Sequence, residues 1–181
     1  DGVEKNQKMQ IREAEVVPGT SSLAVAEMTK KYGVYAVFGM AERESEGSET
    51  VYNSAVVCGP EGIIGTYRKI HPALAEQRWC VRGDEPFSFD TPWGPVGVGI
   101  CYDSYNFHEL IRYYAAIGCR LYLNPTAIGP SGRHDWRDYY MYGLKQCVNS
   151  CEIFVASSNL VGNNMVDEEE GGSLGNIADV G

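Results

Sequence analysis

The stretch Pro95-Val96-Gly97-Val98-Gly99-Ile100-Cys101-Tyr102-Asp103 decides how the rest of the chain can be arranged. Its apolar residues occur at every second position and alternate with small residues, which is typical of a buried strand. Residues 104–118 then carry apolar and aromatic side chains at helical spacing, and Gly118 is well placed to end that helix. The pattern therefore predicts a strand that runs into a helix, with Cys101 at the turn between them.

A cysteine at such a turn has two interpretations. The first backbone N–H groups of a helix have no acceptor within it, so they can stabilise a thiolate or a developing oxyanion. A free cysteine is also often an inert packing residue. Its position alone leaves Cys101 as either a nucleophile or a small core residue.

The composition is that of a globular protein with one core. The chain has 181 residues, of which 44% are hydrophobic and 22% are charged, so we expect a single domain over residues 1–181. The net charge of -9 argues against a nucleic-acid partner, which would need a basic face. No apolar run approaches the length that spans a bilayer, so we expect no membrane partner.

The cysteines and histidines indicate neither a metal site nor a disulfide framework. The six cysteines form no C-x-x-C pair, and they are positions 58, 80, 101, 119, 147 and 151. Cys147 and Cys151 share a face of a predicted helix and are expected to pack. The histidines at 71, 108 and 134 lack ligand-like spacing, so no metal is expected. This cysteine usage favours a reducing, cytoplasmic location.

Helix and strand patterns alternate along the chain. Residues 1–12 predict no clear element, the strand at 34–40 is expected to be buried on both faces, and the acidic run at 167–170 is expected to be a surface loop. The strands at 51–58 and 63–69 predict a hairpin. The other predicted elements are helices at 23–32 and 135–150 and strands at 87–90, 120–124 and 153–157. This order predicts an α/β fold with a mixed sheet.

Two charged residues upstream of Cys101 are candidates for chemistry. Lys69 ends a predicted strand at the start of an irregular loop, and Glu76 lies seven residues further on. A lysine beside a cysteine favours the thiolate and can stabilise the negative oxygen of a tetrahedral intermediate. A nearby carboxylate keeps that lysine charged and in position. Considered singly, each is also an ordinary surface residue.

Four ordered motifs resemble the carbon–nitrogen hydrolase (nitrilase and amidase) superfamily. They are Y-R-K-x-H-P at 67–72, E-x-x-x-x-x-x-G-D at 76–84, G-x-G-I-C-Y-D at 97–103 and N-P-T-A at 124–127. The resemblance covers residues 15–162 in the family's order. It implies an α-β-β-α sandwich of the nitrilase type with mixed sheets. It also implies hydrolysis of amide, nitrile or carbamoyl groups without metal or cofactor.

The resemblance also implies a role for individual residues. Cys101 would be the nucleophile that forms a thioester, Lys69 would stabilise the tetrahedral intermediate, and Glu76 would position the lysine. The backbone N–H of Tyr102 would assist at the oxyanion, and the pocket would be lined by Asn124, Thr126 and Ala127. A homo-oligomer acting on a small amide or nitrile is expected, and the sequence does not distinguish these two substrates.

One part of the family's pattern is not found. The general-base glutamate of the family follows its first strand in an apolar-Pro-Glu context, and no such context precedes Pro18. Glu4, Glu13 and Glu15 stand in other contexts and are not assigned this role. The family's closing strands are missing or barely begun at 172–174. We therefore expect a nitrilase-type fold truncated at both ends.

Two other functions stay open. A binding or assembly module derived from the family would keep the fold with an incomplete acid–base set. An unrelated Cys–His hydrolase would place His71 or His108 within hydrogen-bond reach of Cys101. Asp103 is expected to cap the following helix rather than to react. Clustered tyrosines are expected to pack or to form a subunit interface, namely positions 113, 114, 139, 140 and 142.

Overall fold

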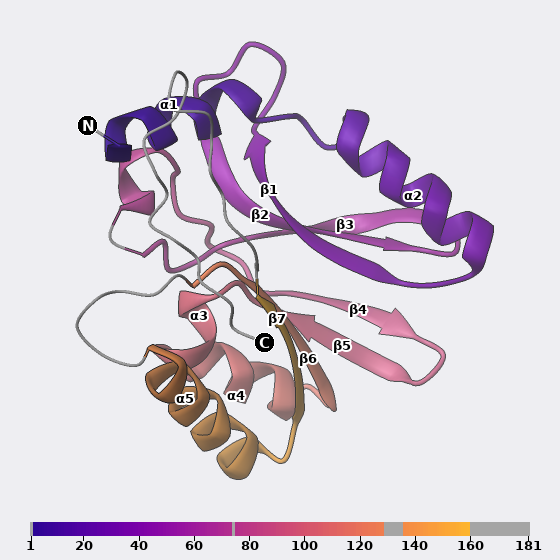
Figure 1. Cartoon of the computed structure of the whole chain (residues 1–181). Coiled ribbons are helices and arrows are strands. Elements are labelled where there is room, and N and C mark those ends of the chain that lie inside the picture. Colours follow the sequence, from indigo (N-terminus) through magenta and orange to yellow (C-terminus); the bar gives the residue numbers. More distant parts are fainter. Residues whose placement is uncertain (1, 74, 129–135, 160–181) are drawn as a thin grey trace.

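A computed structural model gives the fold of the chain and describes residues 2–73, 75–128 and 136–159 (Figure 1). The helices are α1 (Gly2–Glu13), α2 (Thr20–Tyr32), the short 3-10 helix η1 (Glu76–Arg78), α3 (Tyr102–Tyr105), α4 (Glu109–Ala116) and α5 (Trp136–Cys151). The strands are β1 (Ala36–Arg43), β2 (Val51–Gly59), β3 (Gly62–Arg68), β4 (Phe87–Thr91), β5 (Gly94–Val98), β6 (Leu121–Thr126) and β7 (Phe154–Asn159). No described helix is both long and apolar enough to cross a membrane.

The strands form two sheets. The first has the order β1-β2-β3 and is antiparallel throughout, so the predicted hairpin of β2 and β3 is confirmed. The second has the order β4-β5-β6-β7. In it, β4 pairs antiparallel with β5, whereas β6 pairs parallel with both β5 and β7. The predicted α/β class with a mixed sheet is therefore confirmed.

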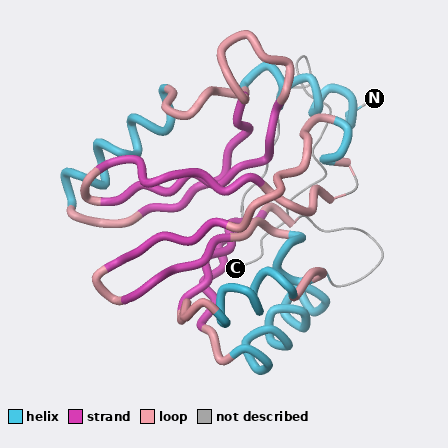
Figure 2. The backbone as a smooth tube through the Cα atoms, turned by 180° about the vertical axis from the view of Figure 1, so that it is seen from behind, coloured by secondary structure: helices cyan, strands magenta, loops and turns pink. Residues whose placement is uncertain are grey.

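The two sheets face one another, and helices cover their outer faces (Figures 1 and 2). Side chains of β2 alternate between two cores because successive strand residues point to opposite faces. Ala55 and Val57 face the second sheet in the large core, whereas Val56 and Cys58 pack under Ala26 of α2. On the far side, α4 contacts β5 and α5 contacts β7. This layering is the α-β-β-α sandwich that the resemblance to the carbon–nitrogen hydrolases implied.

The small residues of the central strand make room for aromatic rings. A Cβ atom at Gly97 would lie 2.5 Å from the ring of Tyr114, and one at Gly99 would lie 1.8 Å from the hydroxyl oxygen of Tyr122. Both tyrosines are fully buried. The alternation of small and apolar residues thus lets α4 and β6 pack directly on the backbone that leads to Cys101.

The helix predicted after Cys101 is divided into two parts, which is a correction to the prediction. α3 ends at Tyr105 and α4 begins at Glu109. Between them the ring of Phe107 stacks on His71 at a centroid distance of 3.9 Å and lies edge-on to Tyr102 at 5.3 Å. These aromatic contacts draw the chain out of the helix. The predicted end at Gly118 is confirmed by its left-handed φ of 95°.

Two terminal or edge elements also differ from the prediction. Residues 2–13 form α1 although they lack an apolar period, because they are rich in good helix formers and Glu4 pairs with Lys8 at 2.8 Å. β1 is not buried on both faces. It is an edge strand of its sheet and forms part of a pocket wall.

The strand predicted to stop before Pro125 continues through it to Thr126. A proline inside a strand is tolerated where its missing N–H is not required. Here the carbonyl oxygen of Pro125 accepts a hydrogen bond from the backbone N–H of Cys101 at 3.1 Å. The acidic run at 167–170 and the histidine at 134 lie outside the described residues.

Candidate active site

Cys101 lies at the turn between β5 and α3 with an unusual backbone conformation. Its φ of 50° is in the left-handed region, which a residue with a Cβ atom rarely adopts. Its backbone N–H donates to Asn124 Oδ1 at 2.7 Å and to Pro125 O at 3.1 Å. Its Sγ lies 3.3 Å from the Tyr105 hydroxyl. The predicted placement of Cys101 at a strand-to-helix turn is therefore confirmed, and the contacts around it hold the strained backbone in place.

The Asn124 side chain supports this turn through hydrogen bonds. Its Oδ1 also accepts a hydrogen bond from Ser104 Oγ at 2.7 Å, and its Nδ2 donates to Tyr140 and Ser157 at 3.1 and 3.0 Å. The side chain is 1% exposed and connects α3, α5 and β7. Asn124 borders a small adjoining pocket, and its polar atoms are engaged by the protein.

Lys69 and Glu76 form an ion pair at the end of β3. The Lys69 Nζ lies 2.7 Å from Glu76 Oε2, and the lysine side chain is fully buried. Glu76 also accepts from Asn53 Nδ2 at 3.1 Å and from the backbone N–H of Ala73 at 2.7 Å. A buried ammonium without a counter-charge would be costly, so these contacts fix both charges.

A pocket of about 600 Å³ lies between the two sheets, and both Cys101 and Glu76 line it. Thr126 and Ala127 lie on its wall at the end of β6 and just beyond it. Apolar residues make up much of the remaining wall, among them Val37, Phe38, Met40, Trp79 and Ile100. The pocket thus offers a small, mostly apolar space beside a thiol and a charged pair.

Tyr102 is the first residue of α3, where a backbone N–H has no acceptor within the helix. Its ring lies edge-on to Tyr105 at 5.9 Å. The fold therefore brings Cys101, Tyr102, Glu76 and the end of β6 together at one place. Lys69 joins them through its ion pair with Glu76. This arrangement is suited to nucleophilic attack on a carbonyl or nitrile carbon.

Comparison with known sequences identifies the family. The sequence profile of the family described as carbon-nitrogen hydrolase matches residues 3–176. The chain belongs to the carbon–nitrogen hydrolase family. It is 37% identical over 124 residues to omega-amidase NIT2 of Homo sapiens and 40% identical over 124 residues to omega-amidase NIT2 of Danio rerio. Each match covers 63% of this hydrolase chain and 44% of the relative, so the chain spans less than half the length of these relatives.

Solved structures share the fold of this carbon–nitrogen hydrolase chain. A carbon-nitrogen hydrolase from Helicobacter pylori G27 superposes with a TM-score of 0.72 at 22% identity, over 80% of this chain and 52% of that one. A nitrilase-superfamily amidase from Nesterenkonia AN1 gives a TM-score of 0.67 at 20% identity, over 77% of this chain and 52% of that one. The nitrilase-type sandwich is therefore confirmed.

The N-terminal glutamates of the hydrolase chain are engaged away from the pocket. Glu15 accepts hydrogen bonds from Ser21 at the start of α2, including one from its backbone N–H at 2.8 Å. Glu4 pairs with Lys8, and Glu13 pairs with Arg12 at 2.6 Å. Within the described ranges, Glu76 is the single carboxylate residue on the pocket wall.

Asp103 does not cap α3 through its side chain, which corrects the prediction. Its carboxylate instead accepts from the backbone N–H of Ile100 at 3.0 Å and contacts the ring of His71 at 2.9 Å. The Cys101 thiol contacts Tyr105 rather than a histidine, so this geometry does not favour a Cys–His pair.

Sequence reasoning did not assign two residues that shape the site, and it gave a third a different role. Asn53 contacts Glu76, and Tyr105 contacts the thiol. Asn124 was predicted to line the pocket with Thr126 and Ala127, but its side chain instead accepts the hydrogen bond of the Cys101 backbone and borders the adjoining pocket. For Asn53, the sequence signal that could have indicated a site role is its position as a polar residue within an apolar strand. For Tyr105, the signal is its spacing of four residues from Cys101, which places both on one face of a helix. Nothing in the sequence showed that Asn124 would lie beneath the turn.

The tyrosines behave differently from one another. Tyr114 is fully buried and Tyr140 is partly buried against the core, whereas Tyr113 and Tyr142 are 46% and 66% exposed. The side chain of the tyrosine at 139 lies outside the described part of the structure. The expected packing role is thus confirmed for the first two.

Four other thiols of the chain are protonated at neutral pH. Burial raises the pKa of Cys80 and of Cys147 to about 11, and it also raises the pKa of Cys58 and of Cys119. A nearby Glu76 carboxylate adds to the effect on Cys80. Reaction with an alkylating agent near neutral pH is therefore expected to spare these four.

These raised pKa values predict a loss of stability at alkaline pH. Above the ordinary thiol pKa of 9, the unfolded chain loses protons that the folded chain retains, so stability falls as the pH rises toward 11. The urea midpoint is expected to be lower at about pH 10 than at about pH 7.5. Cys147→Ala should flatten this dependence, whereas Ser150→Ala on the same helix should not. Equal midpoints at both pH values would contradict the prediction.

Proposed function

We propose that this chain carries the active site of an amidase-like hydrolase that cleaves non-peptide carbon–nitrogen bonds through a thioester on Cys101. The observation that carries the proposal is one pocket lined by both Cys101 and Glu76, with the buried Lys69 ammonium 2.7 Å from the glutamate. Family membership and the omega-amidase relatives support amide substrates, since those relatives are named for that activity.

The proposed reaction has two steps. The Cys101 sulfur attacks the amide carbon and forms the C–S bond as the thiol gives up its proton. The C–N bond then breaks, and the leaving nitrogen takes up that proton. Water then attacks the thioester, which releases a carboxylic acid and regenerates the thiol. Lys69 and the backbone N–H of Tyr102 stabilise the negative oxygen in each tetrahedral intermediate.

The other residues have supporting roles in this proposal. Glu76 holds the Lys69 ammonium in place and maintains its charge. Thr126 and Ala127 contact the substrate from the wall of the pocket, and Asn124 acts through the Cys101 backbone rather than on the substrate. A nitrile would use the same nucleophile, with nitrogen in place of the carbonyl oxygen.

A structural neighbour is consistent with a cysteine nucleophile. In one structure of the amidase from Nesterenkonia sp. AN1, the acetamide moiety of fluoroacetamide is covalently attached to the active-site cysteine. We place Cys101 in the corresponding role as part of the proposal.

A second function is a binding or assembly module that retains the pocket without turnover. One observation favours it: Glu76 is the single carboxylate residue that the described residues contribute to the pocket wall. A missing general base costs about 10²- to 10⁴-fold in rate. Slow or absent turnover combined with tight binding of small amides would support this alternative.

The state of the thiol tests the proposed function. Iodoacetamide labelling at about pH 6.5, read by peptide mass, should modify Cys101 faster than the other cysteines. Lys69→Met keeps the length of the side chain without its charge. Because the thiolate is the reactive form and a neighbouring positive charge stabilises it, the variant should slow labelling about tenfold.

Lys145→Ala provides the control for this experiment, because it removes a lysine that is exposed on α5. It should label like the parent chain. Labelling of Cys101 that is unaffected by Lys69→Met would overturn the proposed site, and the binding module would then be the better account.

We propose three further features of the protein. All six cysteines are free thiols, which supports a reducing, cytoplasmic location. Exposed aromatic side chains on α4 and α5, at Tyr113 and Tyr142, support assembly into a homo-oligomer. One core that both sheets share supports a single domain.

A further inference from the structure

The carboxylate of Asp103 is fully buried and has all its acceptor positions occupied. Its Oδ1 accepts from the backbone N–H of His71 and contacts His71 Nδ1, both at 2.9 Å. Its Oδ2 accepts from the Tyr67 hydroxyl at 2.8 Å and from the backbone N–H of Ile100 at 3.0 Å. A carboxylate with four such contacts is rigidly held.

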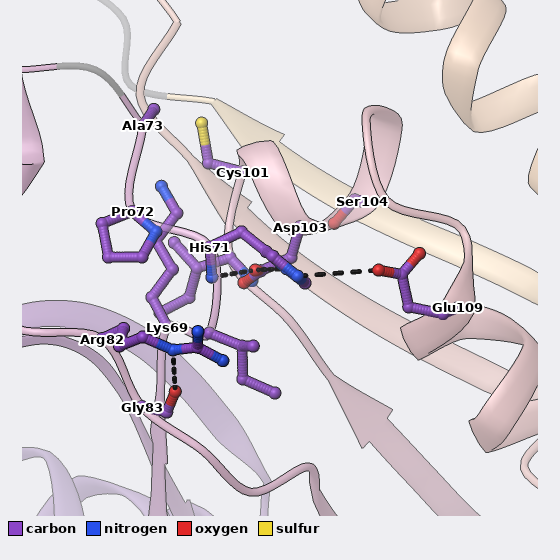
Figure 3. Close-up of polar contacts among 12 residues, drawn as sticks. Lys69, His71, Pro72, Ala73, Arg82, Gly83, Cys101, Asp103, Ser104 and Glu109 are labelled. Carbon is purple, nitrogen blue, oxygen red and sulfur yellow. Dashed lines mark hydrogen bonds and ion pairs between the residues drawn. The ribbon is translucent and has the colours of Figure 1, made fainter.

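These contacts join the two segments that build the active site. Asp103 and Ile100 flank Cys101 at the strand-to-helix turn. Tyr67 and His71 flank Lys69 at the end of β3. Asp103 is thus hydrogen-bonded to residues on either side of Lys69 and to a residue next to Cys101. Figure 3 shows Asp103 and His71 together with Cys101 and Lys69.

The imidazole of His71 is held on three sides. Because a carboxylate only accepts hydrogen bonds, Nδ1 must donate to Asp103. The opposite nitrogen, Nε2, lies 3.6 Å from Glu109 Oε1, and the ring face stacks on Phe107. Glu109 is largely exposed, so the buried hydrogen bond to Asp103 is the stronger of the two polar contacts.

We propose that the hydrogen bond from His71 Nδ1 to Asp103 is a clasp that positions the Lys69 ammonium relative to the Cys101 thiol. His71 and Asp103 are positioning residues, since neither lines the pocket that holds the thiol. The inference rests on the proposed function, because it concerns the same thiol and ammonium. A misplacement of about 1 Å in an active site can cost about 10²-fold in rate.

Two substitutions of His71 separate the hydrogen bond from the aromatic stack. His71→Asn keeps a side-chain N–H at the position of Nδ1 and loses the ring, whereas His71→Phe keeps a ring on Phe107 and loses the donor. The rate of Cys101 alkylation at about pH 6.5 should stay within about twofold of the parent in the first and fall about tenfold in the second. His108→Phe is the matched control and should label like the parent.

If His71 only stabilised the fold, the result would be different. The His71→Phe protein would open more often, and all buried cysteines would be labelled faster because opening exposes them. The clasp predicts slower labelling of Cys101 with the other thiols unchanged. It also predicts that His71→Phe adds no further slowing in a Lys69→Met background, because the clasp acts through that ammonium.

Asp103→Asn gives a second test. In either orientation its amide N–H₂ would face a backbone N–H, that of His71 or that of Ile100, which cannot turn away. It should therefore slow Cys101 labelling at least as much as His71→Phe, measured at a temperature at which circular dichroism shows the variant folded.

The outcomes distinguish the two proposals. If Lys69→Met slows labelling and His71→Phe does not, the clasp is wrong and the proposed function stands. Equal slowing in His71→Asn and His71→Phe also overturns the clasp, since the hydrogen bond would then not be the cause. If Lys69→Met itself has no effect, the failure lies with the proposed function.

Discussion

Glu76→Ala is expected to lower the free energy of unfolding by about 3 kcal/mol or more. The variant leaves the Lys69 ammonium with a fully buried side chain and without its carboxylate partner at 2.7 Å. It also removes the acceptor for Asn53 and for the backbone N–H of Ala73. Urea unfolding at neutral pH, followed by tryptophan fluorescence, measures the change.

A double substitution identifies the cause of this loss. Adding Lys69→Met to Glu76→Ala removes the unpaired charge, so the double variant should recover part of the stability, a coupling of about 1 kcal/mol or more. Glu85→Ala, at an exposed glutamate, is the control and should change stability by less than about 0.5 kcal/mol. If the stability lost in the double variant equals the sum of the losses in the two single variants, the ion pair is not what stabilises this loop.

Gly99→Ala should be among the most destabilising single substitutions in the chain. The added Cβ would lie 1.8 Å from the hydroxyl oxygen and 2.7 Å from the Cζ of Tyr122, and 3.0 Å from a methyl carbon of Leu110. Tyr122 is fully buried and its hydroxyl contacts Ser104, so the ring cannot move aside without cost. We expect a loss of about 3 kcal/mol, at the upper end of the range for overpacking.

Gly39→Ala is the matched control for this substitution. It also lies in a strand, its φ is not left-handed, and the nearest atom to its added Cβ is a carbonyl oxygen at 3.9 Å. It should leave the stability unchanged or raise the free energy of unfolding by up to about 1 kcal/mol, because alanine lowers the conformational entropy of the unfolded chain. Combining Gly99→Ala with Tyr122→Phe should recover part of the loss. Equal stability of the two glycine variants would show that β5 and β6 are not packed as described.

These predictions bear on function because the same backbone carries the nucleophile. Gly99 and Ile100 connect β5 to Cys101, and the Gly99 N–H donates to Leu123 on β6 at 3.1 Å. A shift of this segment would move the Cys101 turn relative to Lys69. A substitution in this segment that costs less stability than Gly99→Ala should therefore reduce the reactivity of the Cys101 thiol while the protein stays folded.

Local patterns were sufficient for most of the architecture. Alternation of small and apolar residues marked β5, the glycine turn marked the β2–β3 hairpin, and Gly118 marked the end of α4. Each depends on neighbours within a few positions, which a sequence displays directly. Where packing at a distance overrides local preference, the prediction failed, as in the break near Phe107, which stacks on His71.

The sequence by itself determined the α/β class, the order of the strands, the placement of Cys101 at a turn, and Lys69, Glu76 and Cys101 as candidate residues for chemistry. The tertiary structure alone decided that Glu76 and Cys101 share a pocket, that Asn124 lies beneath the turn, and that Asp103 links both segments. The physical reason is distance along the chain: these contacts join positions more than twenty residues apart, and no local period encodes which of many polar groups will meet when the two sheets close.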